Sequence, residues 1–231
     1  MRFKINAALL TQARESLSGR KNIYWIVGGA GSGKSTVCKA LSERLDIPLY
    51  DMDAHMYGDY HGRFIEKIHP VNKAWANAEN GLAWLLDMRW EAFHNFNQAA
   101  LPEYVNLLVE DLKKINLDVG ILIDGGIINP ALIAEVISPR QIISLARPEC
   151  SSAEIWSENE ERSLMKDYVF QLPNPEEAWR NFLEFDTLIT ETIFREAQEK
   201  NITICARNES ETVDNFSEHV ARKLGIWHQA K

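Results

Sequence analysis

The chain has 231 residues, a hydrophobic fraction of 45% and seven tryptophans, which together are typical of one folded domain with a sizeable core and exclude a disordered chain. Its formal net charge of −8, from 33 acidic and 25 basic residues, argues against an extended nucleic-acid surface, because such a surface needs a basic stripe. A small anionic ligand remains compatible with this charge, since a few local donors can hold one.

The cysteines and the apolar runs indicate a protein of the reducing cytoplasm. The three cysteines are odd in number, widely spaced and without a CxxC pair, so we expect neither a disulfide framework nor a zinc site. No apolar run approaches the ~20 residues that span a bilayer, so we expect no membrane partner. The basic N-terminal stretch, although partly amphipathic, is predicted to be a helix packed on the domain.

Five short apolar runs predict the strands of a parallel sheet. Each run is nearly continuous instead of alternating, as in strands that are covered on both faces. Helical patterns lie between the runs, and this alternation predicts a doubly wound α/β domain. The predicted strands are 22–28, 48–53, 119–124, 141–146 and 202–207, and the predicted helices include 33–45, 129–137, 176–200 and 211–225.

Two intervals are too long to be simple crossovers between strands. Residues 55–117 are rich in Trp and Leu and are predicted to form a helical substrate cap inserted after the second strand. Residues 147–175 are polar, contain three prolines and follow the fourth strand, so they are predicted to form a mobile lid. We expect a single domain over 1–231 that contains both insertions.

The glycine-rich stretch IVGGAGSGKST, at 26–36, is the strongest functional signal. It contains the pattern GxxxxGK[ST] between a predicted strand and a predicted helix. Glycine permits close approach of phosphate to several backbone N–H groups, and the following helix directs its N-terminal donors at the same anion. Lys34 would add a charge at the β- and γ-phosphates, and the Ser35 hydroxyl would bind Mg²⁺. A merely flexible loop is the alternative. The predicted nucleotide-binding residues are Gly28, Gly29, Ala30, Gly31, Ser32, Gly33, Lys34, Ser35 and Thr36.

Acidic residues end the second and third predicted strands. Asp51 and Asp53 stand two apart, so on a strand they project together, and ligands of parallel α/β sheets bind beyond the carboxyl ends of the strands. One carboxylate can hold water on Mg²⁺, while the other accepts a proton from an attacking hydroxyl. Either aspartate could instead cap the next helix. Asp124 is predicted to bind Mg²⁺ directly or through water, with Gly125 and Gly126 beside the substrate, unless this stretch is only a turn.

Three stretches together resemble the shikimate/gluconate kinase branch of the small-molecule P-loop kinases: the glycine-rich loop, the pair Asp51 and Asp53, and the pair Gly125 and Gly126. The wider set of adenylate, cytidylate and dephospho-coenzyme A kinases shares the loop, the inserted cap and the lid. WLLDMRW, DGGIINP and NFLEFD also resemble an uncharacterised bacterial group of P-loop kinase-like proteins. The resemblance implies a three-layer P-loop NTPase fold with sheet order 2-3-1-4-5, and ATP and Mg²⁺ as cofactors. It also implies in-line γ-phosphoryl transfer, with Asp53 at the substrate hydroxyl and Asp51 at a magnesium-bound water.

Shikimate itself is not the expected substrate. The cap of this chain is longer than that of shikimate kinases and rich in tryptophan. Asp124 also stands where those kinases commonly have an uncharged residue.

Basic residues in the lid are candidates for stabilising the transition state. Arg162 is the predicted catalytic arginine, and Lys166, four residues later, shares its helix face if this stretch is helical. Arg147 at the end of the fourth predicted strand is a further candidate. The alternative for Arg162 and Lys166 is an exposed charged face.

Basic residues elsewhere complete the predicted site. Arg63 and Arg89 in the cap could hold a carboxylate or phosphate of the substrate, although Arg89 lies between two tryptophans and could serve packing alone. Arg207 follows the fifth predicted strand, where related kinases form part of the adenine pocket.

The sequence thus predicts an ATP- and Mg²⁺-dependent phosphotransferase that acts on a hydroxyl or phosphate of a small metabolite. Closure of the cap and lid would exclude water from the γ-phosphate. The alternative is a P-loop ATPase, or a nucleotide-binding regulatory protein without kinase activity. The chain lacks a well-placed NKxD guanine signature and an LSGGQ helix after the loop, so GTPases and ABC-type ATPases fit less well.

Overall fold

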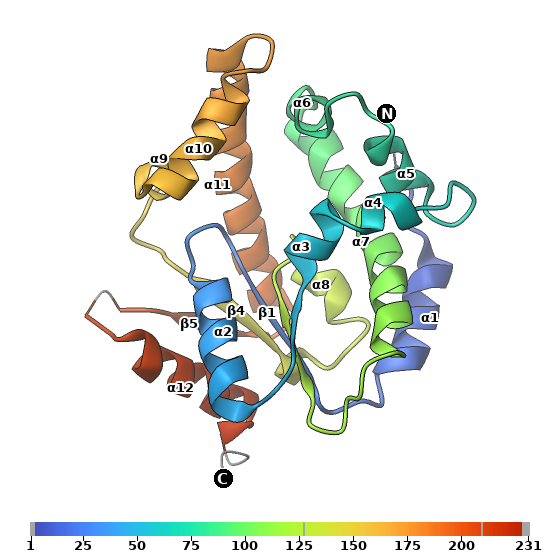
Figure 1. The fold of residues 1–231 in the computed structure, drawn as a ribbon, viewed down its shortest axis with the longest axis vertical. Coiled ribbons are helices and arrows are strands. Elements are labelled where there is room, and N and C mark those ends of the chain that lie inside the picture. Colours follow the sequence, from blue (N-terminus) through green and yellow to red (C-terminus); the bar gives the residue numbers. More distant parts are fainter. Residues whose placement is uncertain (1–2, 127, 209, 228–231) are drawn as a thin grey trace.

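The computed structural model describes residues 3–126, 128–208 and 210–227 (Figure 1). Its centre is a five-stranded sheet in the order β2-β3-β1-β4-β5, in which all neighbouring strands are parallel. This confirms the predicted α/β class and strand order. The strands are β1 (Ile23–Gly28), β2 (Leu49–Asp51), β3 (Ile121–Asp124), β4 (Ile142–Ala146) and β5 (Thr203–Ala206), and a short 3-10 helix, η1 (Pro139–Gln141), precedes β4.

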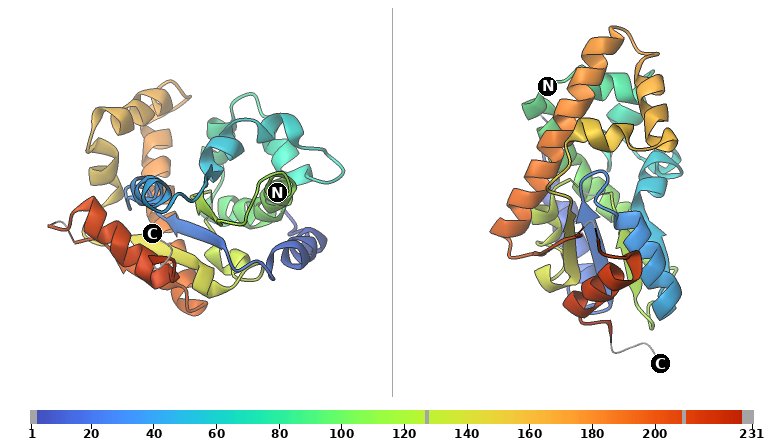
Figure 2. Two further views of the ribbon diagram at one scale, coloured as in Figure 1. Left: turned by 60° about the horizontal axis from the view of Figure 1, so that its bottom comes forward. Right: turned by 90° about the vertical axis from the view of Figure 1, so that its left-hand side faces the viewer.

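Helices cover both faces of the sheet, so the molecule has three layers (Figure 2). Side chains alternate along each strand: Ile26 of β1 packs in the core shared with α2 and α12, whereas Trp25 and Val27 pack in the core shared with α1, α7, α8 and α11. Both sides are apolar, which explains the continuous apolar runs of the sequence. The helices are α1 (Ala7–Leu17), α2 (Lys34–Leu45), α7 (Trp90–Leu112), α8 (Pro130–Ile133), α11 (Pro175–Glu199) and α12 (Val213–Leu224).

The segment predicted as a cap is helical and begins earlier than expected, because Asp51 caps a helix that starts at Met52. Its last helix, α7, has a dual position: it contacts α5 of the cap and also packs on α1 beside the sheet. The cap is therefore anchored in the core layer and is not a free insertion. Its other helices are α3 (Met52–Tyr57), α4 (Tyr60–Arg63), α5 (Pro70–Ala76) and α6 (Gly81–Leu86).

The segment predicted as a lid contains two helices, α9 (Ser152–Ser157) and α10 (Glu160–Val169). Local caps explain them: the Ser151 side chain accepts from Glu154 N–H in a capping box, and Asn159 accepts from Arg162 N–H. Both helices contact α11, which runs from the sheet to the outer end of the lid (Figure 1).

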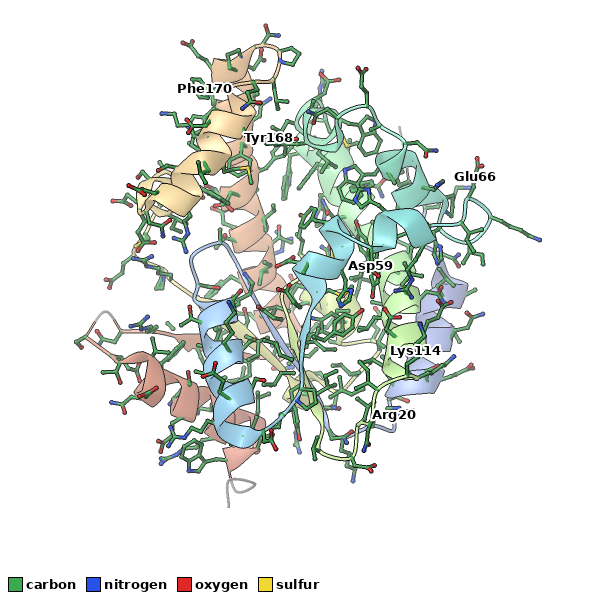
Figure 3. The ribbon with its side chains drawn as sticks, viewed as in Figure 1. Arg20, Asp59, Glu66, Lys114, Tyr168 and Phe170 are labelled. Carbon is green, nitrogen blue, oxygen red and sulfur yellow. The ribbon has the colours of Figure 1, made fainter. Side chains whose placement is uncertain are left out.

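Figure 3 shows Tyr168 and Phe170 in this outer part of the lid, where both are exposed. Within the described residues, no helix combines the length and apolar character that crossing a bilayer requires.

Candidate active site

The glycine-rich loop connects β1 to α2 in a conformation that depends on glycine. Gly31 and Gly33 have φ values of 69° and 86°, in the left-handed region that favours glycine. A Cβ at Gly28 would collide with the carbonyl oxygen of Leu145 in β4. The Ser32 hydroxyl is buried and has no hydrogen-bond partner among the described residues. The loop is thus a tight turn that holds one buried hydroxyl without a partner among the described residues.

Positive charge and free donors gather at the start of α2. The helix begins at Lys34 with no side-chain cap and no acidic residue in its first turn, so its first N–H groups remain available to a ligand. The Lys34 ammonium lies across the loop and donates to the Gly29 carbonyl at 3.2 Å. Together with the helix dipole, these groups suit a polyphosphate.

Asp124 lies at the end of β3, next to Asp51 of β2 in register. Its side chain is 3% exposed, and its Oδ1 has no hydrogen-bond partner among the described residues. Burial raises the pKa of this carboxyl, and the Asp51 charge adds to the effect, whereas the Ser35 hydroxyl and Lys34 lower it. An unsatisfied buried carboxylate oxygen is a suitable ligand for a hard cation such as Mg²⁺.

Asp51 serves as the N-cap of α3, and its Oδ1 accepts the Ala54 N–H at 2.9 Å. The capping role that the sequence left open is therefore present. No group of three or more His, Cys, Asp or Glu side chains forms a metal cage among the described residues. Mg²⁺ in phosphate-transfer sites needs only one or two carboxylates besides phosphate and water, which the set Ser35, Asp51 and Asp124 can supply.

Asp53 is on the first turn of α3, and the expectation that it follows Asp51 along a strand is corrected, because β2 ends at Asp51. Its Oδ1 accepts the Gly126 N–H at 3.0 Å. Burial raises the pKa of Asp53; Asp124 also raises it, while Lys34 and the Gly126 N–H lower it.

The turn after β3 must be glycine-rich to admit this carboxylate. A Cβ on Gly125 would collide with Asp53 Oδ2, and Gly125 and Gly126 have φ values of 69° and 70°. The buried indole of Trp25 donates to the Gly125 carbonyl at 2.9 Å and fixes the turn from below.

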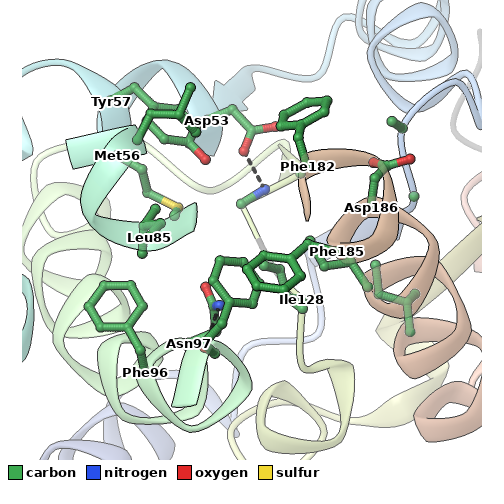
Figure 4. A pocket seen from close by; sticks show the side chains of 18 of the residues that line it. Asp53, Met56, Tyr57, Leu85, Phe96, Asn97, Ile128, Phe182, Phe185 and Asp186 are labelled. Carbon is green, nitrogen blue, oxygen red and sulfur yellow. Dashed lines mark hydrogen bonds between the residues drawn. The ribbon is translucent and has the colours of Figure 1, made fainter. Parts of the chain in front are cut away.

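A cavity of about 700 Å³ unites these groups. Its lining includes loop residues Gly28, Gly29 and Ala30, together with Lys34 and Asp53. Figure 4 shows Asp53 bonded to the turn at one side of this space. The glycine-rich loop and the candidate proton acceptor Asp53 thus face the same cavity.

The rest of the cavity wall comes from the cap, the lid, α11 and the segment between β3 and α8, and few of its residues are predicted from the sequence. Asp186 of α11 is the main omission, since it lines the cavity and is 8% exposed. The spacing of Phe182, Phe185, Asp186 and Ile189 places them on one helix face, and this pattern could have identified them. The apolar and polar wall residues include Met56, Tyr57, Trp75, Leu82, Leu85, Phe93, Phe96, Asn97, Leu101, Tyr104, Ile128, Asn129, Trp156, Met165, Tyr168, Phe182, Phe185, Asp186, Ile189 and Ile193.

Neither cap arginine lies where the sequence analysis expected it, and both predictions are corrected. Arg63 forms two hydrogen bonds with Asp111, at 2.6 and 2.9 Å, and also pairs with Asp59 and Glu110. Its charge is satisfied within the cap wall. Arg89 is the exposed N-cap residue of α7. Neither residue lines the cavity.

Arg162 lies close to the glycine loop. A Cβ on Gly31 would lie 3.3 Å from an Arg162 guanidinium nitrogen and would collide with the Ile155 side chain. Arg162 and Arg147 both pair with Glu158. The guanidinium of Arg147 lowers the pKa of this carboxyl, and Arg162 contributes. In the lid, the Glu158 carboxylate thus pairs with two guanidinium groups, and the guanidinium of Arg162 lies beside the glycine loop.

The remaining predicted residues lie outside the cavity. The exposed Arg207 donates twice to the Glu211 carbonyl, at 3.0 and 2.9 Å, in the loop after β5. Lys166 of α10 is exposed, and its ammonium lies 5.4 Å from the centre of the Phe170 ring. Thr36 is exposed on the first turn of α2.

No family model matches the chain, and no curated protein matches it in sequence. Among solved structures, the crystal structure of TT1252 from Thermus thermophilus is similar: it is 18% identical over 88% of this chain and 96% of that chain, with a TM-score of 0.48. The function must therefore be argued from the geometry of the site.

Proposed function

We propose that this protein is an ATP- and Mg²⁺-dependent phosphotransferase that moves the γ-phosphoryl group to a hydroxyl of a small molecule. One observation carries the proposal: Lys34 of the glycine loop and the Asp53 carboxylate line a single cavity of about 700 Å³. That volume is in the range of small-molecule sites. A phosphate chain on the loop and an acceptor in the cavity would therefore meet beside Asp53.

The phosphates would be held by the loop N–H groups, by the N-terminus of α2 and by Lys34. Ser35, Asp124 and the second oxygen of Asp51 would hold Mg²⁺, which supplies charge neutralisation when bound. The buried, unpartnered Oδ1 of Asp124 supports this assignment. These groups fix the reacting phosphorus but do not activate the acceptor.

Asp53 would activate the acceptor. In the transfer, the acceptor oxygen forms a bond to the γ-phosphorus, the bond from that phosphorus to the leaving oxygen of ADP breaks, and the hydroxyl proton passes to Asp53. Because Oδ1 is engaged by Gly126 N–H, Oδ2 is the oxygen available for the proton. Burial raises the pKa of Asp53, which makes it a stronger base than an exposed aspartate.

The lid would supply further positive charge at the phosphates. Arg162, already beside Gly31, can transfer its guanidinium from Glu158 to the phosphates as the lid closes. Cys38, Cys150 and Cys205 are free cysteines; this state suits a reducing compartment, so we propose a cytoplasmic location.

Two substitutions test the proposal. Asp53→Asn should leave ATP binding by calorimetry within about twofold and reduce ADP release with an acceptor by about 10²-fold or more. Lys34→Ala should weaken ATP binding itself. The matched control is Asp118→Asn, which removes one exposed carboxylate from the loop before β3. This variant should behave as the unsubstituted protein.

Two outcomes contradict the proposal. Full transfer by Asp53→Asn would remove the base assignment. Steady ATP turnover by the unsubstituted protein that no acceptor stimulates would identify an ATPase instead.

A further inference from the structure

The acceptor side of the cavity is apolar and largely aromatic. Rings come from three directions: Trp75 and Phe96 from the cap, Trp156 from the lid, and Phe182 and Phe185 from α11. Figure 4 shows Phe96 on one side of the space and Phe182 and Phe185 on the other. Such a wall gains free energy by covering apolar surface of a ligand, at roughly 25 cal/mol per Å².

Cations are scarce on this wall. Among the described residues that line the cavity, Lys34 is the sole lysine or arginine, and it lies across the phosphate loop on the Gly29 carbonyl. His61 also lines the cavity, but burial lowers its pKa, so it is neutral at pH 7. Arg63 and Arg89 lie elsewhere. An acceptor with a carboxylate or phosphate would thus bring a charge into an apolar site without a counter-ion, which is costly.

Asp186 gives the wall a negative group. It directly follows Phe185 on α11, is 8% exposed, and its Oδ2 has no hydrogen-bond partner among the described residues. Burial raises the pKa of this carboxyl, whereas the neighbouring Ser152 and Trp156 side chains lower it, as do the charges of Lys34 and Arg162. Asp186 lines the cavity, and a buried carboxylate with an oxygen that lacks a partner suits a donor on the ligand, a cationic donor best.

Resting on the proposed function, we infer that the acceptor is a largely apolar alcohol that carries no carboxylate or phosphate, and that Asp186 receives an amino group of that acceptor. The hydroxyl would lie at Asp53, the ammonium at Asp186 and the hydrocarbon against the rings. Asp186 is then a specificity-determining residue, distinct from the proton acceptor. The opposite choice, an anionic metabolite, has no partner on this wall.

Three probes of similar size and shape test the inference: phenylalaninol, N-acetylphenylalaninol and phenyllactate. All carry a phenyl ring and a hydroxyl, but the first is a cation, the second is neutral and the third is an anion. Binding is measured without nucleotide by quenching of tryptophan fluorescence, because Trp75 and Trp156 line the cavity. Transfer is measured separately by ADP release with ATP and Mg²⁺.

We expect phenylalaninol to bind at least tenfold more tightly than phenyllactate, with N-acetylphenylalaninol between them. Asp186→Asn should weaken phenylalaninol binding by about tenfold, as expected for loss of a charged hydrogen bond, and should change N-acetylphenylalaninol little. Glu184→Gln removes an exposed carboxylate from the same helix and is the matched control, which should change neither. ATP binding should be preserved in both variants.

The outcomes separate the inference from the proposed function. Tighter binding of phenyllactate, no binding of any probe at millimolar concentration, or phenylalaninol binding that is insensitive to Asp186→Asn would overturn the inference. If ATP binding instead falls in Asp186→Asn while the preference for the amine persists, Asp186 orients Lys34 and the assigned role is overturned. Amine binding without phosphoryl transfer would support the acceptor class and count against the kinase. Transfer to anionic alcohols alone would support the kinase and count against the acceptor class.

Discussion

Asp53, Asp124 and Asp186 are three carboxylates whose pKa is raised, and burial is the largest cause for each. A buried carboxylate whose hydrogen bonds are incomplete destabilises the folded state when it ionises. Ser32, whose buried hydroxyl is also unpartnered, adds to the set of unsatisfied polar atoms. Concentration of such groups in one region is typical of a site built for a ligand at some cost in stability.

Asp124→Asn should therefore stabilise the protein without ligands while it abolishes magnesium-dependent transfer. The folded-state pKa of Asp124 lies above its ordinary value of 3.8, so the folded state binds more protons between these two values. The contribution of Asp124 to stability is thus most favourable below pH 3.8 and is lost as the pH rises through the folded-state value. At pH 7 the variant should gain about 1 kcal/mol, or roughly 2–4 °C in Tm.

Thermal melts from pH 4 to pH 8 measure this effect. The difference in Tm between the variant and the unsubstituted protein should shrink as the pH falls from 8 toward 4, because the protonated fraction of Asp124 grows. A variant that is less stable at pH 7, or equally shifted at every pH, would show that the carboxylate is not held under this penalty.

At the scale of elements, one buried carboxylate joins the cap to the core layer. Glu103 of α7 is 1% exposed and accepts three hydrogen bonds at the start of α5, from Val71 N at 3.0 Å and from Asn72 N and Nδ2 at 2.8 Å each. It thereby caps α5, whose own N-cap residue makes no side-chain cap bond. The position of the cap over the cavity depends on this contact.

Glu103→Ala should lower the free energy of unfolding by about 3 kcal/mol, since it leaves two buried backbone N–H groups without an acceptor and removes one of the two acceptors of Asn72 Nδ2. Glu110→Ala on the same helix is the control: its side chain is half exposed and pairs with Arg63 at 3.4 Å, so its cost should stay below about 1 kcal/mol. Urea unfolding of both variants measures the difference. Equal costs would show that Glu103 does not hold α5.

The strands and the glycine loop could be predicted from sequence because their signals are local. Each strand end lies within two residues of the apolar run that predicted it. The spacing of the two aspartates predicts that Asp53 lies on a strand with Asp51. The N-cap at Asp51 is the stronger signal, and it starts α3 before Asp53 is reached.

Tertiary contacts explain the other differences. Arg63 is held by Asp111, 48 positions along the chain, and the neighbours of Asp186 include Ser152 and Trp156 of the lid helix α9. Neither contact leaves a local pattern in the sequence. The apolar residues of α11 do form a helical pattern, and Asp186 is the polar residue on that face.

At the scale of the molecule, the cavity has a floor formed by the strand ends and the glycine loop, and two walls, the cap and the lid, which are attached to the rest of the domain in different ways. The floor is the carboxyl edge of β1, β2 and β3 with the glycine loop, and the cap is anchored through α7 and Glu103. The lid is carried by the outer end of α11 and reaches the loop through Ile155 and Arg162 at Gly31. Figure 1 shows the two walls rising from the same edge of the sheet. We therefore expect the lid, more than the cap, to respond to nucleotide.

We expect Glu158 to limit the affinity of the lid for nucleotide, because its carboxylate pairs with both Arg147 and Arg162. Glu158→Gln should remove the carboxylate partner of Arg162 and raise the affinity for ATP and Mg²⁺ by about two- to fivefold, the range for exposed ion pairs. Hydrogen exchange should report the same event: ATP and Mg²⁺ should slow exchange in α9 and α10 and leave β1 and β3 unchanged. Glu160→Gln, two residues further along the chain and exposed, is the matched control for charge. Unchanged or weaker ATP binding in Glu158→Gln, with Glu160→Gln behaving alike, would mean that these arginines do not meet the phosphates.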